Sequence, residues 1–319
     1  LVSVISTGSG LDVWDLTDPT APKPLAPIDD IPSHKVGVVP GTPIVYNARS
    51  NGGNNGLVPG PGNVDPAMGA GIIDIYDFSD PENPVRLPDF ENGYGCHHVY
   101  FWNNLTEEKF RSVCAGIEYT QIFDTTDPGA PTIIVSVPYG LGRTDLPSQS
   151  ASIAAFAHYA GISRDGTILL VGDESGGGIG PIGCVARVDT PQGAVSVPVG
   201  AVWFYDISDE TDPQYLGHVS ASQLDRMVTN PQGVDPTASC TAHHGRLIPV
   251  DDGDVLAMSF YGAGVVVIDF TNVRNEGAAL PTVVAQYVGA NSNVWETWYY
   301  NGHLYTGDMG RGMDILDIE

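Results

Sequence analysis

Positive charge is the scarcest property of this sequence. Lysine and arginine together number 13, against 38 aspartate and glutamate residues, which gives a formal net charge of −25 at pH 7. A chain with so few basic residues cannot neutralise a phosphate backbone, so we expect no nucleic-acid partner. Much of the aspartate lies in turns, which accounts for most of the acidic excess. The remainder fits a salty environment, or Ca²⁺ sites built from clustered surface carboxylates.

Long apolar runs and apolar residues at helical spacing are also lacking. We find no transmembrane segment and no signal peptide, and the chain opens within a strand-like segment, as expected of a processed or trimmed protein. Glycine (39) and proline (25) are frequent along the whole chain, while 42% of the residues are hydrophobic. This composition argues against disorder and favours an all-β fold with many turns.

Cysteine is scarce, and its spacing excludes two common sites. The four cysteines form no Cys-x-x-Cys pair, which excludes a zinc knuckle and a thioredoxin motif. An even count in an acidic, lysine-poor chain favours an oxidising compartment, so we expect a secreted or cell-surface protein, extracellular or periplasmic. Cys96 and Cys114 are the better disulfide candidate, which leaves Cys184 to pair with Cys240. Free buried thiols are the alternative.

One motif is present in abundance. It is a stretch of β-branched and aromatic residues that ends in aspartate and is followed by Ser/Thr-Asp-Pro. Copies that differ in detail lie at residues 11–19, 73–81, 120–128, 202–209, 265–271 and 313–318. The apolar part predicts a strand, and the Asp-Pro part predicts a turn that reverses the chain.

Each complete repeat predicts four strands, of which the motif strand is the third. Four antiparallel strands repeated along a chain are typical of β-propeller blades. We therefore expect an all-β fold in which residues 1–319 form a single β-propeller domain of six blades. Five or seven blades, or a two-sheet sandwich, are the alternatives. Loop insertions are expected at about residues 50–70 and 175–198.

The histidines follow the repeat. Aligning the opening strands of five repeats gives one position occupied by His34, His97, His158, His243 and Glu296. The next position is occupied by Lys35, His98, Tyr159, His244 and Thr297. Opening strands of propeller blades line the central channel, so equivalent side chains are expected to form a ring around its axis. Imidazole and carboxylate ligands suit Cu, Zn or Fe, and the ring therefore predicts a transition-metal site.

Residues beside the ring are predicted to support it. His98, Tyr159 and His244 are expected to lie behind the ligands and orient them. The alternative is that a histidine at a strand start is a framework residue with the same hydrogen bond in every blade. Two observations favour the metal: Glu296 replaces histidine by another ligand type, and histidine is rare elsewhere in the chain.

Three carboxylates at the ends of returning strands are candidate catalytic residues. Asp173, Glu174 and Asp308 are predicted to act as acid or base groups beside the ring. They could instead support the imidazoles, bind Ca²⁺, or be ordinary turn residues.

The motif strand with its Asp-Pro-x-x-Pro turn resembles the LVIVD repeat of bacterial and archaeal secreted or surface-anchored β-propellers. The resemblance covers nearly the whole chain and implies an architecture and a location, but no particular activity. The histidine-lined channel is also distantly similar, in architecture and ligand type only, to the selenium-binding protein and methanethiol oxidase propellers, in which histidines hold copper.

Two functions follow from these expectations. The first is a metal-dependent enzyme, hydrolytic or oxidative, that acts on an unknown small molecule. The second is a non-catalytic cell-surface module that binds a partner or joins an assembly and holds at most a structural metal.

Overall fold

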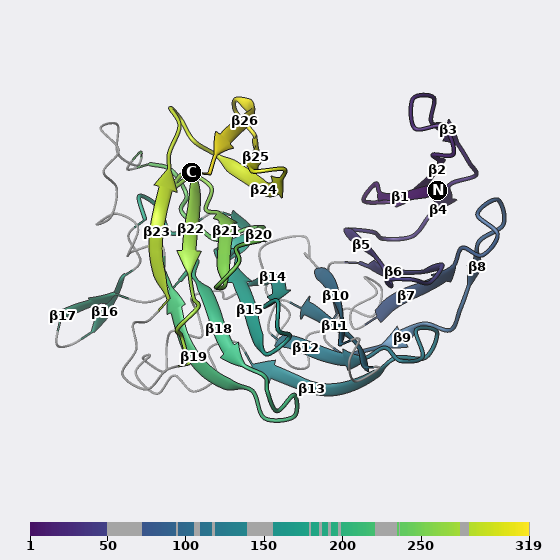
Figure 1. Ribbon diagram of the computed structural model, residues 1–319, viewed down its shortest axis with the longest axis horizontal. Coiled ribbons are helices and arrows are strands. Elements are labelled where there is room, and N and C mark those ends of the chain that lie inside the picture. Colours follow the sequence, from purple (N-terminus) through teal and green to yellow (C-terminus); the bar gives the residue numbers. More distant parts are fainter. Residues whose placement is uncertain are drawn as a thin grey trace. The chain divides into compact units, whose positions relative to one another are not determined.

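In the computed structural model, the chain consists almost entirely of strands in small antiparallel sheets, and the fold is the predicted six-bladed β-propeller (Figure 1). The structure describes residues 1–49, 72–93, 95–104, 109–116, 119–138, 156–178, 180–184, 187–190, 193–196, 199–220, 235, 237–274 and 281–318. The chain divides into two compact units, residues 1–138 and 139–319. Within the described ranges, the only helix is the single turn α1 (Ser175–Gly178), too short to cross a membrane.

Unit 1 contains the first three blades. Blade 1 consists of β1 (Val2–Ser6), β2 (Gly10–Asp15), β3 (Lys23–Pro24) and β4 (Ile28–Asp29). Blade 2 consists of β5 (Lys35–Val38), β6 (Ile44–Ala48), β7 (Ile72–Asp77), β8 (Val85–Arg86) and β9 (Phe90–Glu91). Blade 3 consists of β10 (His98–Asn104), β11 (Lys109–Gly116), β12 (Tyr119–Asp124) and β13 (Thr132–Pro138). The insertion expected at residues 50–70 lies outside the described residues.

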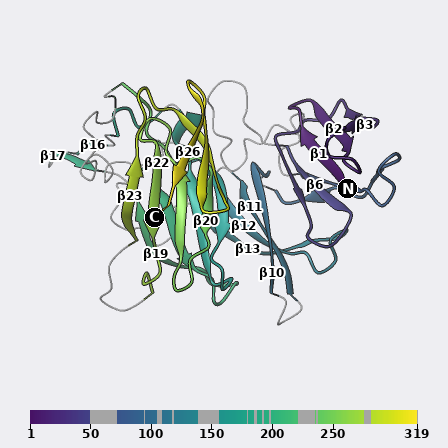
Figure 2. The same ribbon diagram turned by 45° about the horizontal axis from the view of Figure 1, so that its top comes forward.

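Unit 2 contains the other three blades, which Figure 2 shows from a second side. Blade 4 consists of β14 (Ala157–Ile162), β15 (Ile168–Asp173), β18 (Val202–Asp206) and β19 (Gln214–Val219). Blade 5 consists of β20 (Gly245–Ile248), β21 (Val255–Ser259), β22 (Val265–Asp269) and β23 (Thr282–Tyr287). Blade 6 consists of β24 (Val294–Tyr300), β25 (His303–Asp308) and β26 (Gly312–Asp317). A hairpin of β16 (Arg187–Thr190) and β17 (Gly193–Ser196) lies within the insertion expected at residues 175–198.

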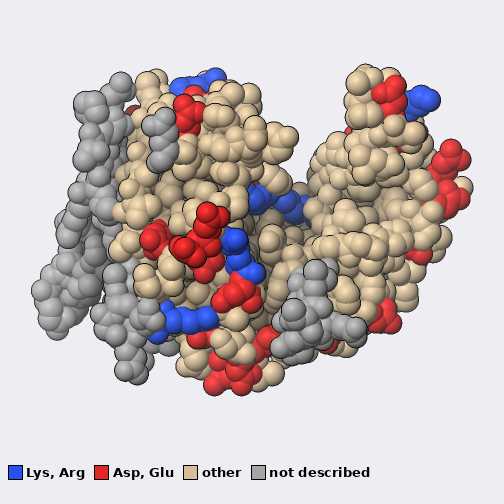
Figure 3. Space-filling view, in the orientation of Figure 1, with Lys and Arg blue, Asp and Glu red and all other residues tan. Residues whose placement is uncertain are grey.

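The repeated motif forms the third strand of blades 2 to 6 and the second strand of blade 1, and its aspartates form the turns that follow. Asp15 accepts hydrogen bonds from the backbone N–H (2.8 Å) and the hydroxyl (2.6 Å) of Thr17. Asp77 does the same with Ser79, at 2.8 and 2.6 Å. These side chains satisfy backbone groups where the strand ladder ends. Acidic side chains accordingly lie in several separate groups on the face drawn in Figure 3. The Ca²⁺ sites expected at surface carboxylates stay a prediction.

We expect these turns to make the fold sensitive to acid. Hydrogen bonds from Thr17 and Ser79 hold the pKa of Asp15 and of Asp77 below the usual value of 3.8. A carboxyl group whose pKa is lower in the folded chain stabilises it above the unfolded pKa, and that contribution disappears as the pH falls through the folded pKa. Urea unfolding should therefore give a lower free energy of unfolding for Asp77→Asn than for the wild type at pH 6, and this difference should shrink at pH 3. Equal differences at the two pH values would contradict this explanation.

Apolar side chains of successive blades pack into the core of each unit. In unit 1, Tyr46, Ile73 and Phe123 are fully buried in one cluster. The hydroxyl of Tyr46 donates a hydrogen bond of 2.8 Å to the carbonyl of Pro128, which links blades 2 and 3. In unit 2, Phe204 and Phe270 pack with ring centroids 5.1 Å apart. Each fully buried side chain of this size stabilises the fold by about 1.5–3 kcal/mol, which explains why the motif strands are apolar.

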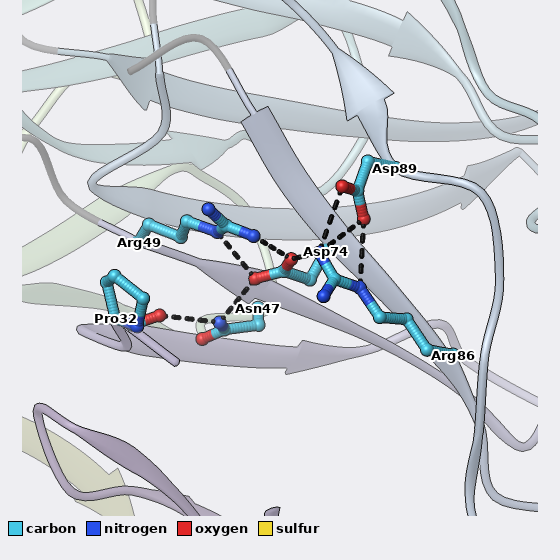
Figure 4. Close-up of polar contacts among 6 residues, drawn as sticks. All are labelled: Pro32, Asn47, Arg49, Asp74, Arg86 and Asp89. Carbon is cyan, nitrogen blue, oxygen red and sulfur yellow. Dashed lines mark hydrogen bonds and ion pairs between the residues drawn. The ribbon is translucent and has the colours of Figure 1, made fainter. Parts of the chain in front are cut away.

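A buried charge network braces blade 2 (Figure 4). Asp74, on motif strand β7, is fully buried, and its carboxylate accepts hydrogen bonds from Asn47 (2.8 Å), Arg49 and Arg86 (2.7 Å). Arg86 also pairs with Asp89. The carboxylate thus joins three segments of one blade, β6 with the residue after it, β7 and β8. A buried charge is tolerated in a protein when it is paired and hydrogen-bonded in this way.

Candidate metal centre

Three histidines of unit 2 come together where blade 4 meets blade 5. His158 lies on β14, and His243 and His244 immediately precede β20. All three side chains are buried, and one ring nitrogen of each lies within 4.8 Å of the others. Such a group of nitrogen donors can hold a transition-metal ion. The sequence placed His158 and His243 in the ring but expected His244 behind it.

Glu174 adds a carboxylate to the histidines. It directly follows β15, and it is buried. Its Oε2 lies 3.5 Å from Nε2 of His158, and its Oε1 lies 3.7 Å from Nε2 of His243. These separations exceed those of N–H···O hydrogen bonds, which are about 2.7–3.2 Å. Ligands about 2.0–2.1 Å from a tetrahedral zinc ion lie about 3.4 Å from one another. The 3.5 Å separation of Oε2 from Nε2 of His158 therefore suits two atoms that share one ion.

A backbone carbonyl determines which nitrogen of His243 faces the carboxylate. Nδ1 of His243 lies 2.5 Å from the carbonyl oxygen of Trp295. A carbonyl oxygen can only accept, so Nδ1 is the donor and carries a proton. In the neutral imidazole, Nε2 then has the free lone pair, and this is the form that binds a metal.

The environment of Glu174 favours loss of its charge when no cation is present. Burial raises its pKa to about 7, and the hydrogen bond from the hydroxyl of Tyr261 acts in the opposite direction. A cation between the carboxylate and the imidazoles would replace the proton and supply the missing charge compensation.

The segment that carries His243 is anchored beside Glu174. The hydroxyl of Thr241 donates to the carbonyl of Asp173 (2.6 Å) and accepts from the N–H of Ser175 (2.8 Å). It therefore holds the backbone on both sides of Glu174. The preceding residue, Cys240, forms a disulfide with Cys184. Cys96 and Cys114 form a second disulfide in unit 1, so both predicted pairs are confirmed.

Two aromatic residues, not singled out in the sequence, contact His243. Its ring centroid lies 4.2 Å from that of Trp295 and 5.3 Å from that of Tyr261. Tyr261 also donates its hydroxyl proton to Oε1 of Glu174. Neither residue repeats from blade to blade, and repetition was the signal that identified the histidines.

Backbone pairing aligns blade 6 with blade 4 one residue away from the alignment expected from the sequence. His158 is the extra residue of a bulge between Ala157 and Tyr159, and Trp295 is the extra residue of the corresponding bulge in β24. Backbone pairing therefore makes Trp295, and not Glu296, equivalent to His158. The carboxylate of Glu296 lies 3.8 Å from Nε2 of His244 and 3.3 Å from the guanidinium of Arg246. Its predicted role as a metal ligand stays a prediction.

Asp173 and Asp308, the other predicted catalytic residues, hold backbone amides in place. Asp173 accepts hydrogen bonds from the N–H of Phe156 (2.8 Å) and of Gly200 (2.7 Å). Asp308 accepts from three backbone N–H groups: Asn293 (2.8 Å), Gly310 (2.9 Å) and Arg311 (3.0 Å). Glu174, the third predicted catalytic carboxylate, lies within 4 Å of the ring nitrogens of two histidines.

Unit 1 brings together two further histidines of the predicted ring. The rings of His34 and His97 have centroids 3.9 Å apart. Their backbone N–H groups donate to carbonyls at or next to the ends of the adjacent strands, those of Ala48 (2.9 Å) and Ala115 (2.8 Å). His243 has the same backbone hydrogen bond to Ser259 (2.9 Å) in blade 5. His98 is buried one position further along, and Tyr159 contacts His244 edge-on at 6.4 Å in unit 2.

Comparison with known proteins places the chain in a class of fold. No protein-family model matches the sequence, and no curated protein matches it significantly. Solved structures that it resembles include Saccharomyces cerevisiae Sqt1, at a TM-score of 0.58 and 8% identity over 98% of this chain and 66% of that one. They also include the β-propeller domain of Myceliophteria thermophila Cps50 (Swd1), at a TM-score of 0.55 and 11% identity over 98% of this chain and 78% of that one. A protein from Lactobacillus plantarum is similar at a TM-score of 0.56 and 12% identity, over 100% of this chain and 78% of that one. These likenesses establish the β-propeller fold alone.

Proposed function

We propose that this chain binds a transition-metal ion, Cu, Zn or Fe, through His158, His243, His244 and Glu174. The observation that carries the proposal is the convergence of two imidazole Nε2 atoms on one buried carboxylate, at 3.5 and 3.7 Å. The Nδ1 proton of His243 is meanwhile held by the carbonyl of Trp295. His34, His97 and Glu296 stay predicted members of the wider ring, and Asp173 and Asp308 stay predicted catalytic residues.

We further propose that the metal serves an enzyme that acts on a small molecule. A bound ion would supply Lewis acidity, an activated water or a redox centre, which suits either hydrolysis or oxidation. Glu174 would orient the ion and hold a proton when the ion is absent. His243 would keep its ring orientation through the carbonyl of Trp295. The supporting residue Thr241 would keep both ligand-bearing segments at a constant separation.

The location proposed is outside the cytoplasm. Two disulfides fit an oxidising environment, and this is consistent with the secreted or surface-anchored LVIVD-repeat propellers that the motif resembles. A strongly acidic surface gives no basis for a nucleic-acid partner.

Metal analysis of protein purified without added metal tests the site. We expect one equivalent of Cu, Zn or Fe in the wild type and loss of that metal in His243→Ala, because the variant removes a central ligand. His303→Ala is the matched control, since His303 is 41% exposed and pairs with Asp317. A metal-free wild type that also takes up none of the three ions on dialysis would rule out the site.

The second candidate function is a non-catalytic surface module with a structural metal, which binds a partner or joins an assembly. Burial of all four proposed ligands favours it, because structural sites are closed and catalytic sites keep an open position. Azide added to the Co²⁺-substituted protein separates the two functions. A change in the visible spectrum would show an open position and support the enzyme, whereas an unchanged spectrum would support the structural metal.

A further inference from the structure

The backbone of Tyr261 adopts a conformation that aromatic residues rarely tolerate. Its φ is +46°, in the left-handed region, and its side chain is buried. Such a conformation persists in a bulky residue only when the surrounding structure enforces it, and residues of this kind gather at functional sites.

The enforcing contacts come from both ends of a tight turn and from the next blade. The N–H of Phe260 donates to the carbonyl of Gly264 at 2.8 Å, which closes the turn around Tyr261. The carbonyl of Tyr261 accepts from the N–H groups of Gly264 and Val294, both at 3.0 Å. Tyr261 and Val294 form an isolated antiparallel bridge between blades 5 and 6. The backbone of Tyr261 is therefore held in place independently of its side chain.

The constrained backbone delivers the phenol to one oxygen of Glu174. The hydroxyl of Tyr261 donates to Oε1, and Oε2 lies 3.5 Å from Nε2 of His158. Gly178 provides the space for this contact, since a Cβ on that residue would lie 2.6 Å from the hydroxyl oxygen of Tyr261. Gly178 also has a φ of +88°, so a glycine there suits both its own backbone and the space that the phenol needs.

We propose that Tyr261 is a positioning residue that determines the metal preference of the site, an inference that rests on the proposed function. By holding Oε1, the phenol fixes the rotation of the carboxylate and leaves Oε2 as the ligand oxygen beside His158. Glu174 then binds through one oxygen and not two. A site with three imidazoles and one carboxylate oxygen selects ions that accept four ligands, such as Zn²⁺ and Co²⁺, over Mn²⁺, which favours six oxygen-rich ligands.

Tyr261→Phe tests this role, because the variant removes the hydroxyl and keeps the ring. We expect its Zn²⁺ affinity to fall about 10- to 100-fold, as is common when a partner of a metal ligand is lost. The visible bands of bound Co²⁺ should weaken, because a carboxylate that is free to bind through both oxygens raises the coordination number. The ratio of Zn²⁺ to Mn²⁺ affinity should fall as well. Tyr287→Phe is the control, since that phenol lies on β23 and is 39% exposed.

A second variant approaches the same hydrogen bond from its other side. Gly178→Ala keeps the phenol but crowds its oxygen, and it should weaken the Co²⁺ bands in the same direction. Wild-type protein that binds none of these ions would overturn the proposed site itself. Wild-type binding that Tyr261→Phe leaves unchanged, in both Zn²⁺ affinity and Co²⁺ spectrum, would overturn the role of Tyr261 and leave the site standing.

Discussion

Replacing Asp74 by alanine is expected to destabilise blade 2 by about 3–5 kcal/mol, the usual effect of removing one partner from a buried ion pair. Asp74 is fully buried, and its carboxylate is shared by Asn47, Arg49 and Arg86. The Arg49 side chain is only 12% exposed, so its charge would stay in the protein interior without this partner. The Arg86 side chain is 43% exposed, so water would largely compensate its guanidinium for the loss of the ion pair with Asp74.

Hydrogen exchange of the β6 and β7 amides measures this effect within blade 2. Asp12→Ala is the matched control, because Asp12 occupies the same place in the motif of blade 1 but is exposed. Its effect should stay within about 0.5 kcal/mol. The destabilisation by Asp74→Asn should lie between those of Asp74→Ala and Asp12→Ala, since an amide keeps some of the hydrogen bonds but loses the charge. Similar exchange rates in Asp74→Ala and Asp12→Ala would refute a bracing role for the network.

Removing the Cys184–Cys240 disulfide is expected to lower the stability of unit 2 by about 2–5 kcal/mol and to weaken metal binding. The bridge closes a sequence separation of 56 residues, which greatly restricts the unfolded chain. Cys240 precedes Thr241, which holds the backbone on both sides of Glu174, and His243 follows two residues later. Loss of the bridge therefore loosens the segment that carries both His243 and His244.

The double variant Cys184→Ser/Cys240→Ser tests the two effects together, by urea unfolding and by Zn²⁺ titration. Cys96→Ser/Cys114→Ser serves as its control, because that pair lies in unit 1 and closes a separation of 18 residues. The control should lose stability but keep its Zn²⁺ affinity. If both variants bind Zn²⁺ as the wild type does, the disulfide plays no part in the site.

The repeat made the architecture predictable. The motif at residues 73–81 and its counterparts combine an apolar strand with an Asp-Pro turn, and this local chemistry recurs regardless of the rest of the chain. Its spacing predicted the blades, the Cys96–Cys114 disulfide and the common backbone position of His34, His97 and His243, and it left Cys184 to pair with Cys240. Local rules were sufficient here because each blade repeats the same hydrogen-bonding pattern.

The details of the site depend on features that the repeat does not specify. Blades 4 and 6 share a bulge whose extra residue is His158 in one and Trp295 in the other, and the alignment of Glu296 with the histidines missed it by one residue because a bulge leaves no signal in the apolar pattern. The contact between Tyr261 and Glu174 joins residues 87 positions apart, through a turn whose positive φ has no sequence signal in a tyrosine. Prediction from sequence is weakest where geometry overrides local preference.

The proposed ligands belong to two segments of the chain, residues 158–174 and residues 243–244, and with a metal bound this division would couple metal supply to the lifetime of the folded protein. An ion bound by both segments would tie blade 4 to blade 5 in the folded state alone, since the unfolded chain does not hold the four side chains together. At a free metal concentration 100 times the Kd, such linkage adds about 2.7 kcal/mol to the free energy of unfolding. Metal scarcity would then shorten the life of the protein as well as empty its site, and the amount of intact propeller would follow the metal content of its surroundings.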